Sequence, residues 1–190
     1  MDDIETKFTK KDRISDDFDV HLSSYCLSIF MTRGRALGKA TPKLVTTNEW
    51  EEIHFFVLNN CDEVKPFIVD YQSEVASSTT MTSIQKKKFI LWFRDRVTTL
   101  SKENNSSVSK HLLALAHGPN RAVTSVNGYI INGSMFRTVK SERGRETQNN
   151  GVVAKGESGV ENLEYYGVLQ EIIEAQYIGA NHVTLFKCDW

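Results

Sequence analysis

An Asn-Gly pair at residues 132–133 constrains the fold of this chain more than any other feature. The run Tyr129-Ile-Ile131 precedes it, and an apolar and β-branched run from Met135 to Val139 follows it. Both central positions of a two-residue hairpin turn need positive φ, which Asn and Gly adopt most readily. The sequence therefore predicts an antiparallel β-hairpin here.

The residues after the hairpin continue the β pattern. The predicted order is a charged loop at residues 140–150, a strand at 152–155, a strand at 165–178, a turn at 179–181 and a last alternating strand at 183–190. The residues Leu169, Ile172 and Ile173 also have helical spacing, so a helix stays open for residues 168–173. The β-branched content of the run favours the strand.

The residues before Gly118 have helical spacing instead. Capping boxes at Thr46–Glu49 and Thr82–Gln85 each precede an apolar stripe at intervals of three and four residues. The predicted helices cover residues 16–33, 47–58, 64–75, 83–100 and 110–117, with a basic, glycine-bearing loop at 33–39 between the first two.

These patterns predict an α+β fold, with short amphipathic N-terminal helices followed by a small antiparallel β meander or partial barrel. The predicted organisation is a disordered lead-in at 1–14, a helical domain at 15–76, a bridging helix and linker at 77–110 and a β-rich domain at 111–190.

The charge balance disfavours nucleic-acid binding by bulk electrostatics, because 23 Lys and Arg residues face 24 Asp and Glu residues. Locally the balance differs. The candidate nucleic-acid-binding residues are Arg137, Lys140, Arg143 and Arg145, opposed within this segment only by Glu142.

Aromatic residues accompany this basic segment. The candidate rings are Tyr129, Phe136, Tyr165 and Tyr166. Small barrels bind single strands by stacking bases on rings beside cations, and they also bind peptides. The alternative, which we favour from sequence, is that the rings belong to the core and the basic residues coat a solubilising loop.

No pattern in the chain predicts catalysis, a metal site or a cofactor. Glu171 and Glu174 lie three residues apart, without a nearby His or a third convergent acid. His21 and His54 lie on apolar helical stripes and are expected to be hydrogen-bonded core residues. The three cysteines, Cys26, Cys61 and Cys188, are expected to be free thiols in a reducing compartment. We expect a protein of the nucleus or cytoplasm, not secreted and not in a membrane, with no small-molecule substrate.

A series of short motifs follows in order along the β-rich part: Leu115-Ala-His-Gly-Pro119, Gly128-Tyr-Ile-Ile-Asn-Gly133, Phe136-Arg-Thr138, Thr147-Gln-Asn-Asn-Gly-Val152, Tyr165-Tyr-Gly167, Glu171-Ile-Ile173 and Leu185-Phe-Lys-Cys-Asp-Trp190. Together these motifs resemble the C-terminal transposase-associated domains of unknown function in plant CACTA (En/Spm-type) transposon proteins. Upstream, Gly34-Arg-Ala-Leu-Gly38, the run from His54 to Ile68 and Phe89-x-x-Trp-Phe93 are similar to the preceding domain and the helix that joins the two.

The resemblance covers roughly residues 20–75 and 89–190, and it implies a role without catalysis. The family's catalytic transposase core has no counterpart in this sequence, and the family's last domain continues past the point matched by Trp190. We therefore expect a truncated β domain in a transposon-derived accessory module for nucleic-acid or protein interaction. The alternatives are an assembly module that holds transposase subunits, or a decayed transposon fragment with no selected role.

Overall fold

The computed structural model of the chain describes residues 3–5, 26–31, 34–75, 81–103, 108–146, 148–155 and 164–190. The helices are α1 (Thr47–Asn59), α2 (Lys65–Glu74), α3 (Ser83–Lys102), α4 (Lys110–His117) and the one-turn α5 (Val139–Glu142). The strands are β1 (Asp3–Glu5), β2 (Gly34–Leu37), β3 (Thr41–Leu44), β4 (Ala122–Val126), β5 (Gly128–Ile131), β6 (Ser134–Arg137), β7 (Gly151–Lys155), β8 (Glu164–Gln176) and β9 (His182–Asp189). Short 3-10 turns lie at Ser28–Phe30, Asp62–Val64 and Ile178–Ala180.

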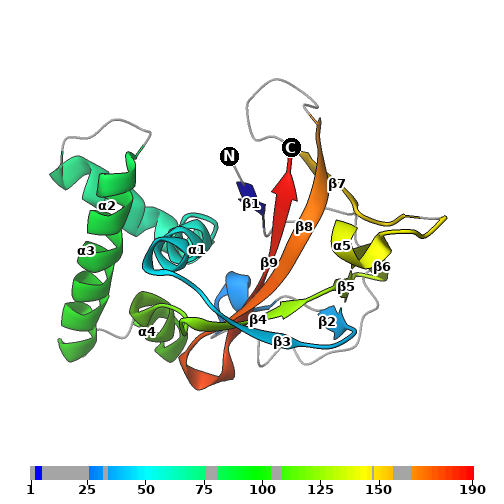
Figure 1. Cartoon of the computed structure of the whole chain (residues 1–190). Coiled ribbons are helices and arrows are strands. Elements are labelled where there is room, and N and C mark those ends of the chain that lie inside the picture. Colours follow the sequence, from blue (N-terminus) through cyan, green and yellow to red (C-terminus); the bar gives the residue numbers. More distant parts are fainter. Residues whose placement is uncertain are drawn as a thin grey trace.

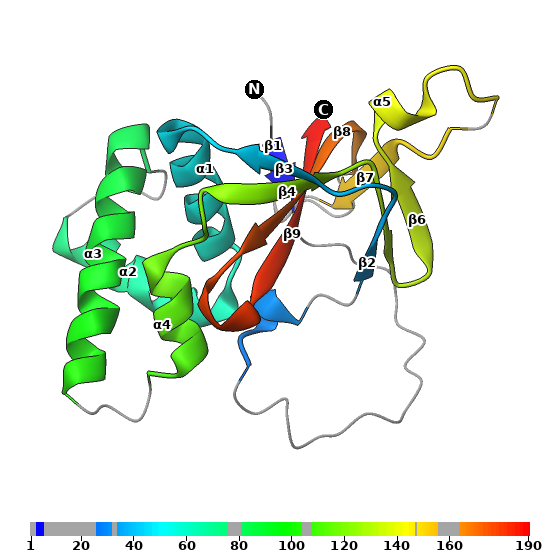
Figure 2. The same cartoon turned by 60° about the horizontal axis from the view of Figure 1, so that its bottom comes forward.

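The strands form two antiparallel sheets. The large sheet has the order β1-β9-β8-β4-β3, and β7 also pairs with β8; the small sheet has the order β2-β5-β6. Helices α1 to α4 gather at one side of the large sheet, whereas the small sheet and α5 lie at the other side (Figures 1 and 2). The predicted α+β class is confirmed, and among the described strands neither sheet closes into a barrel.

Strand β8 lies at the centre of this arrangement and is buried on both faces in its C-terminal half. Ile173 and Ala175 belong to the hydrophobic cluster shared with the helices, whereas Leu169 and Ile172 belong to the cluster shared with the small sheet. A strand covered on both sides reads as a continuous apolar run. Because both faces of the strand are buried, its apolar residues do not simply alternate, and the sequence was also compatible with a helix at residues 168–173. The predicted strand is confirmed.

The local signals of the sequence predicted their elements well. The capping boxes at Thr46 and Thr82 both form, and each begins a helix at the next residue. At the hairpin, β5 pairs with β6, and the turn residues Asn132 and Gly133 have φ of 49° and 72°. The hairpin prediction is confirmed, with the positive φ values that the Asn-Gly pair was expected to supply.

The prediction that all regular structure before Gly118 is helical is wrong. Residues 34–37, predicted as a loop, form β2 and pair with β5, and residues 41–44 form β3 at the edge of the large sheet beside β4. Both strands are mostly exposed, so they show no alternation of apolar and polar residues. They form because distant strands offer backbone partners, which no local pattern reveals.

The N-terminal predictions also need correction where the structure describes them. Residues 3–5, predicted as part of a disordered lead-in, form β1 and pair with β9. The first predicted helix does not continue through Phe30: Leu27 is extended, with ψ of 142°, and only a 3-10 turn follows. The backbone N–H and the hydroxyl of Ser28 both donate to the carboxylate of Glu63, at 2.9 and 3.0 Å. The remainder of that helix, with His21, lies outside the described residues.

The helices and the large sheet share one hydrophobic cluster. It contains residues from all the segments predicted as separate domains, such as Val57 of α1, Phe93 of α3 and Leu185 of β9. The predicted domain boundaries stay a prediction. Within the described ranges, no helix is both long enough and apolar enough for a bilayer crossing.

Gly118 ends α4 at a tightly packed corner of this cluster. Its φ is 84° and its ψ is 171°, and a Cβ placed there would lie 2.6 Å from the Trp50 ring. The Trp50 ring is held in place, because its Nε1–H donates to the carbonyl oxygen of Pro119 at 2.7 Å. The Gly-Pro pair therefore stops the helix and also makes room for the α1 side chains.

His54 packs beside Trp50 as a fully buried residue, as predicted, but without the hydrogen bond that the sequence analysis expected. Its ring lies 5.1 Å from the Trp50 ring and 6.3 Å from the Tyr177 ring, centre to centre. Neither of its ring nitrogens has a hydrogen-bond partner among the described residues. Burial lowers the pKa of His54 from 6.5 to about 3, so the ring is neutral at pH 7.

We predict that two glycines with positive φ differ strongly in their tolerance of alanine. Gly133 faces open space, so Gly133→Ala pays only for the left-handed backbone, about 1–2 kcal/mol. Gly118→Ala adds a clash with Trp50 to a backbone conformation that only glycine adopts readily, for a total of about 3–5 kcal/mol. Urea denaturation measures both costs, and equal costs would contradict the packing at Gly118.

We also predict a loss of stability in mild acid that depends on His54. Its pKa is lower in the folded than in the unfolded chain, so its contribution is complete above pH 6.5 and is lost as the pH falls towards 3. The free energy of unfolding should fall by about 1.4 kcal/mol for each pH unit in this range. His54→Gln should flatten this dependence between pH 6.5 and 5 in urea titrations. An unchanged slope would show that His54 is not the group responsible.

Candidate nucleic-acid interface

The four basic residues predicted from sequence lie on one protrusion that follows the hairpin. Arg137 ends β6, Lys140 lies on α5, and Arg143 and Arg145 come directly after α5. Lys140, Arg143 and Arg145 are exposed. Arg137 is half-buried, and its buried Nε has no hydrogen-bond partner among the described residues. The structure thus brings three cations to the surface together, while the fourth is partly enclosed.

The predicted charged loop is wrong in its first part, because residues 139–142 form α5. The backbone carbonyl of Asn127 anchors this turn, since it accepts bonds from the Thr138 N–H at 3.0 Å and from the Ser141 hydroxyl at 3.1 Å. The Arg137 N–H donates to the carbonyl of Asn149 at 3.1 Å, which closes the base of the protrusion. These bonds hold the basic residues on an ordered segment.

Glu142 is the buried centre of the protrusion. Its residue surface is only 1% exposed, and its carboxylate accepts a hydrogen bond from the backbone N–H of Asn149. From the sequence, Glu142 was interpreted as a negative charge that offsets the basic residues of this segment. Its role in the structure is instead to tie α5 to the chain that returns towards β7. No local sequence signal distinguishes it from an exposed acid such as Glu146.

A β-bulge in β8 determines which of its side chains belong to the candidate interface. The pairing of β8 with β9 shifts between Leu169 and Glu171, so Gln170 is the extra residue. Leu169 lies opposite Cys188 and faces the small sheet, whereas Val168 lies opposite Asp189 and faces the other way. Beyond the bulge, Glu171 lies opposite Lys187 on the same side as Val168. The bulge keeps the polar residues of both strand halves on one face.

We call this surface the open face: it is the helix-side face of the large sheet where the strands extend past α1. Its residues are Val153, Tyr166, Val168, Glu171, Lys187 and Asp189. Figure 1 shows β7 and the N-terminal half of β8 reaching away from the helices. The hydrophobic face that packs against the helices therefore continues as a mixed, accessible surface.

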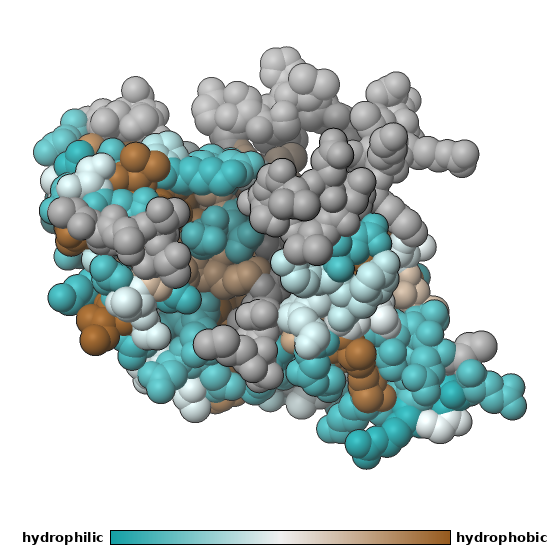
Figure 3. Space-filling model, turned by 90° about the horizontal axis from the view of Figure 1, so that it is seen from above, coloured by the Kyte–Doolittle hydropathy of each residue, from teal (hydrophilic) through white to brown (hydrophobic). Residues whose placement is uncertain are grey.

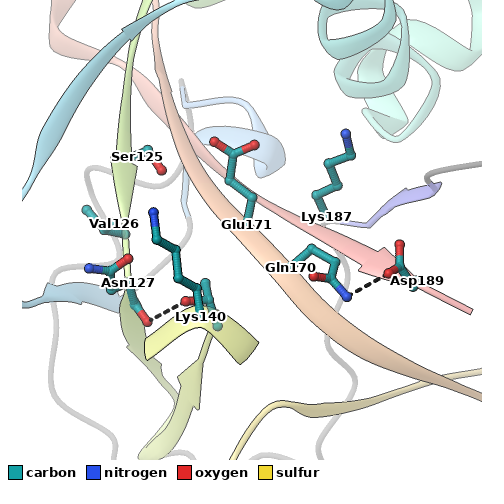
Figure 4. A pocket seen from close by; sticks show the side chains of 9 residues that line it. Ser125, Val126, Asn127, Lys140, Gln170, Glu171, Lys187 and Asp189 are labelled. Carbon is teal, nitrogen blue, oxygen red and sulfur yellow. Dashed lines mark hydrogen bonds between the residues drawn. The ribbon is translucent and has the colours of Figure 1, made fainter. Parts of the chain in front are cut away.

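A pocket of about 430 Å³ lies between the open face and α5. Its lining residues are Ser125, Val126, Asn127, Thr138, Lys140, Gln170, Glu171, Lys187 and Asp189. In Figure 4, Lys140 stands on the α5 side and Glu171 stands across from it on β8, with Lys187 and Asp189 on β9 behind. One predicted site residue, Lys140, thus meets charged residues that the sequence did not place beside it.

The acids of this surface already have partners within the protein. The ammonium of Lys43 lies 3.1 and 3.0 Å from the two oxygens of Glu171, and Gln170 donates to Asp189 at 2.6 Å. No ion pair among the described residues involves Lys140, Arg143 or Arg145. Within the part of the chain that the structure describes, Glu171 and Asp189 thus have partners, whereas these three cations form no ion pair.

A second hollow adjoins the first and reaches the helices. This groove of about 700 Å³ shares Glu171 and Lys187 with the pocket, and Ile53, Phe55 and Phe56 of α1 line its other side. Figure 3, seen from above, shows the molecule hollowed between the helices and the sheet, with hydrophobic atoms deep inside. Along its rim, hydrogen bonds from Thr46 lower the pKa of Glu49, and the charges of Lys43 and Lys187 lower it further.

The four candidate rings divide between the core and the surface. Tyr129 is buried, with its hydroxyl 3.0 Å from that of Thr184, and Phe136 packs against the Phe186 ring at 5.5 Å. Tyr165 and Tyr166 are 47% and 70% exposed. The prediction that the rings belong to the core is therefore confirmed for Tyr129 and Phe136 and is wrong for the two tyrosines of β8.

The acids considered for metal binding do not converge. Glu171 lies on the open face, whereas Glu174 lies near Tyr129 on the opposite face and raises the pKa of that phenol after the larger effect of burial. Within the described ranges, no three His, Cys, Asp or Glu side chains are grouped as a metal site. Cys61 and Cys188 are buried and form no disulfide, and burial raises the pKa of the Cys61 thiol to about 12.

We predict that Glu142 stabilises the protrusion specifically. Glu142→Ala removes the buried carboxylate that accepts the bond from the Asn149 N–H, which should cost about 1–3 kcal/mol. Hydrogen exchange at the Asn149 amide should accelerate accordingly. The exposed neighbour Glu146 supplies the control, and Glu146→Ala should change neither the stability nor the exchange. Equal behaviour of the two variants would contradict the anchoring role of Glu142.

Comparison with known proteins adds no relative: no family model, no curated protein and no solved structure matches this chain. The resemblance to CACTA transposon proteins therefore stays a prediction from the motifs, and the candidate function rests on the geometry of the basic protrusion and the open face.

Proposed function

We propose that this chain is a non-enzymatic nucleic-acid-binding module, derived from a CACTA-type transposon protein. The proposed partner is DNA, and the proposed place of action is the nucleus. Lys140, Arg143 and Arg145 are its proposed phosphate contacts, with Arg137 supporting them from the end of β6.

One observation carries this proposal: three acids near the basic protrusion are bound within the protein, whereas its exposed cations form no ion pair among the described residues. Glu171 is bound by Lys43, Asp189 by Gln170 and Glu142 by the Asn149 backbone. Because the net charge of the chain is −1, a phosphate backbone can be attracted only where cations are locally free. The protrusion supplies such a place.

The rigidity of the protrusion supports the same proposal. A cation on an ordered segment loses less conformational freedom on binding than one on a mobile tail. The bonds from α5 to Asn127 and from Glu142 to Asn149 fix the backbone that carries these side chains. Because the protrusion carries few cations, the binding that we propose is weak and strongly dependent on salt.

A second candidate function is assembly of subunits through the helices. Ile84 and Leu91 lie seven residues apart on α3, which places them on one face, and they are 67% and 51% exposed. Exposed apolar residues on one helix face are typical of association surfaces. This reading predicts a contact between copies that depends little on salt.

The nucleic-acid proposal predicts a change in salt dependence. Each phosphate contact contributes roughly 0.7 to 0.9 to the slope of log affinity against log salt, so Arg143→Ala with Arg145→Ala should flatten the slope by roughly 1.4 to 1.8. Fluorescence anisotropy of labelled single- and double-stranded DNA at several salt concentrations measures it. The control, Lys88→Ala with Arg96→Ala, removes two exposed cations of α3 and should leave the slope unchanged. Absence of binding at low salt would refute the proposal.

The assembly candidate predicts a different result in sedimentation. If the α3 face joins two copies, the parent chain sediments as a dimer at both low and high salt, and Ile84→Glu with Leu91→Glu makes it a monomer. Arg143→Ala with Arg145→Ala serves as the matched surface control and leaves the dimer intact. A parent chain that is monomeric at micromolar concentration would refute assembly through this face.

A further inference from the structure

The open face carries an exposed aromatic ring, Tyr166, whose presence is not explained by packing in the core. Tyr166 is 70% exposed, and its cross-strand partner Val153 is 49% exposed. Val168, two residues along β8 on the same face, is 41% exposed. A protein that only needed a solvated strand end could place polar residues at all three positions. The face instead presents a ring on an apolar base.

The hydroxyl of Tyr166 is bound within the protein. It donates to the carboxylate of Glu164 at 2.6 Å, and this bond raises the pKa of Tyr166. The plane of the ring therefore remains available for contact, while the polar edge is occupied. Because Glu164 is an anion at this end of the face, a phosphate is disfavoured beside the ring, and a neutral base is favoured.

The phosphate-attracting end of the face lies towards α5. Lys140 lines the pocket there and has no ion pair among the described residues, and Arg143 and Arg145 follow on the same protrusion. The face thus separates two kinds of contact: cations on the protrusion and an exposed ring on the sheet. Unpaired nucleotides offer the same two groups, a charged backbone and a flat base.

We propose that the open face makes this module selective for single-stranded nucleic acid, with an unpaired base stacked on Tyr166 and the adjoining phosphates on Lys140 and Arg143. This inference rests on the proposed function and names its substrate class. In a duplex, the faces of the bases are covered by their neighbours, so a ring on a sheet cannot stack on them. A single strand exposes its bases to such a ring.

The structure supplies a matched pair of tyrosines for the test. Tyr165 is the neighbour of Tyr166 in β8, it is 47% exposed, and it faces the opposite side of the sheet. Tyr165→Ala therefore removes an exposed ring from the same strand without changing the open face. Tyr166→Phe keeps the ring and removes only the bond to Glu164.

The experiment measures binding of labelled oligothymidine and of a mixed-sequence duplex by fluorescence anisotropy. We expect tighter binding to the single strand, and Tyr166→Ala should weaken it about tenfold. The salt slope should stay unchanged, because stacking releases no counterions. Tyr166→Phe and Tyr165→Ala should bind like the parent, and Tyr166→Ala should leave duplex binding unaltered.

Photocrosslinking with oligonucleotides that carry 4-thiothymidine gives an independent result in the parent chain. A crosslink in the peptide that contains Tyr166 supports the inference, and crosslinks confined to other peptides overturn it. Equal binding of both DNA forms, with no effect of Tyr166→Ala, also overturns it and leaves the proposed function intact. Absence of binding to either form refutes the proposed function itself. A protein ligand found on this face in place of DNA would overturn both.

Discussion

The double burial of β8 is the constraint on which the rest of this structure depends. Its Ile173 and Ala175 pack against the helices, and its Leu169 and Ile172 pack against the small sheet. Removal of either layer would expose a row of apolar side chains along a thirteen-residue strand. Helices α1 to α4 belong to one hydrophobic cluster and the small sheet to the other, and β8 joins the two because it contributes side chains to both.

The candidate site arises where that constraint ends. Along the helix side of β8, the sequence passes from the buried Ile173 to the ion-paired Glu171, then through the bulge to the exposed Val168 and Tyr166. The bulge matters because, without the extra residue Gln170, the face of one half of the strand would be reversed relative to the other half. Lys140 then approaches this face from α5, which joins two parts of the molecule in one pocket.

The sequence predicted those elements whose cause is local. The capping boxes at Thr46 and Thr82 and the Asn132–Gly133 turn depend on residues within a few positions of one another, and all three form. Strands β2 and β3 were not predicted, because their partners β5 and β4 lie far away in the sequence. Of the site, Lys140, Arg143 and Arg145 could be predicted as a cluster, whereas the pairing of Lys43 with Glu171 depends on the sheet order alone. The place of Lys187 at the site could not be predicted either, because it lies far from Lys140 in the sequence.

We infer that β8 makes the helices and the sheets one cooperative unit. Native-state hydrogen exchange on the parent chain and on Ile173→Ala tests it, because loss of this side chain should remove about 2–5 kcal/mol of stability. We predict that the most protected amides of α1, α3 and β9 lose the same free energy in the variant. If the amides of α1 and α3 keep their protection while those of β9 lose theirs, the helices fold separately and the claim is contradicted.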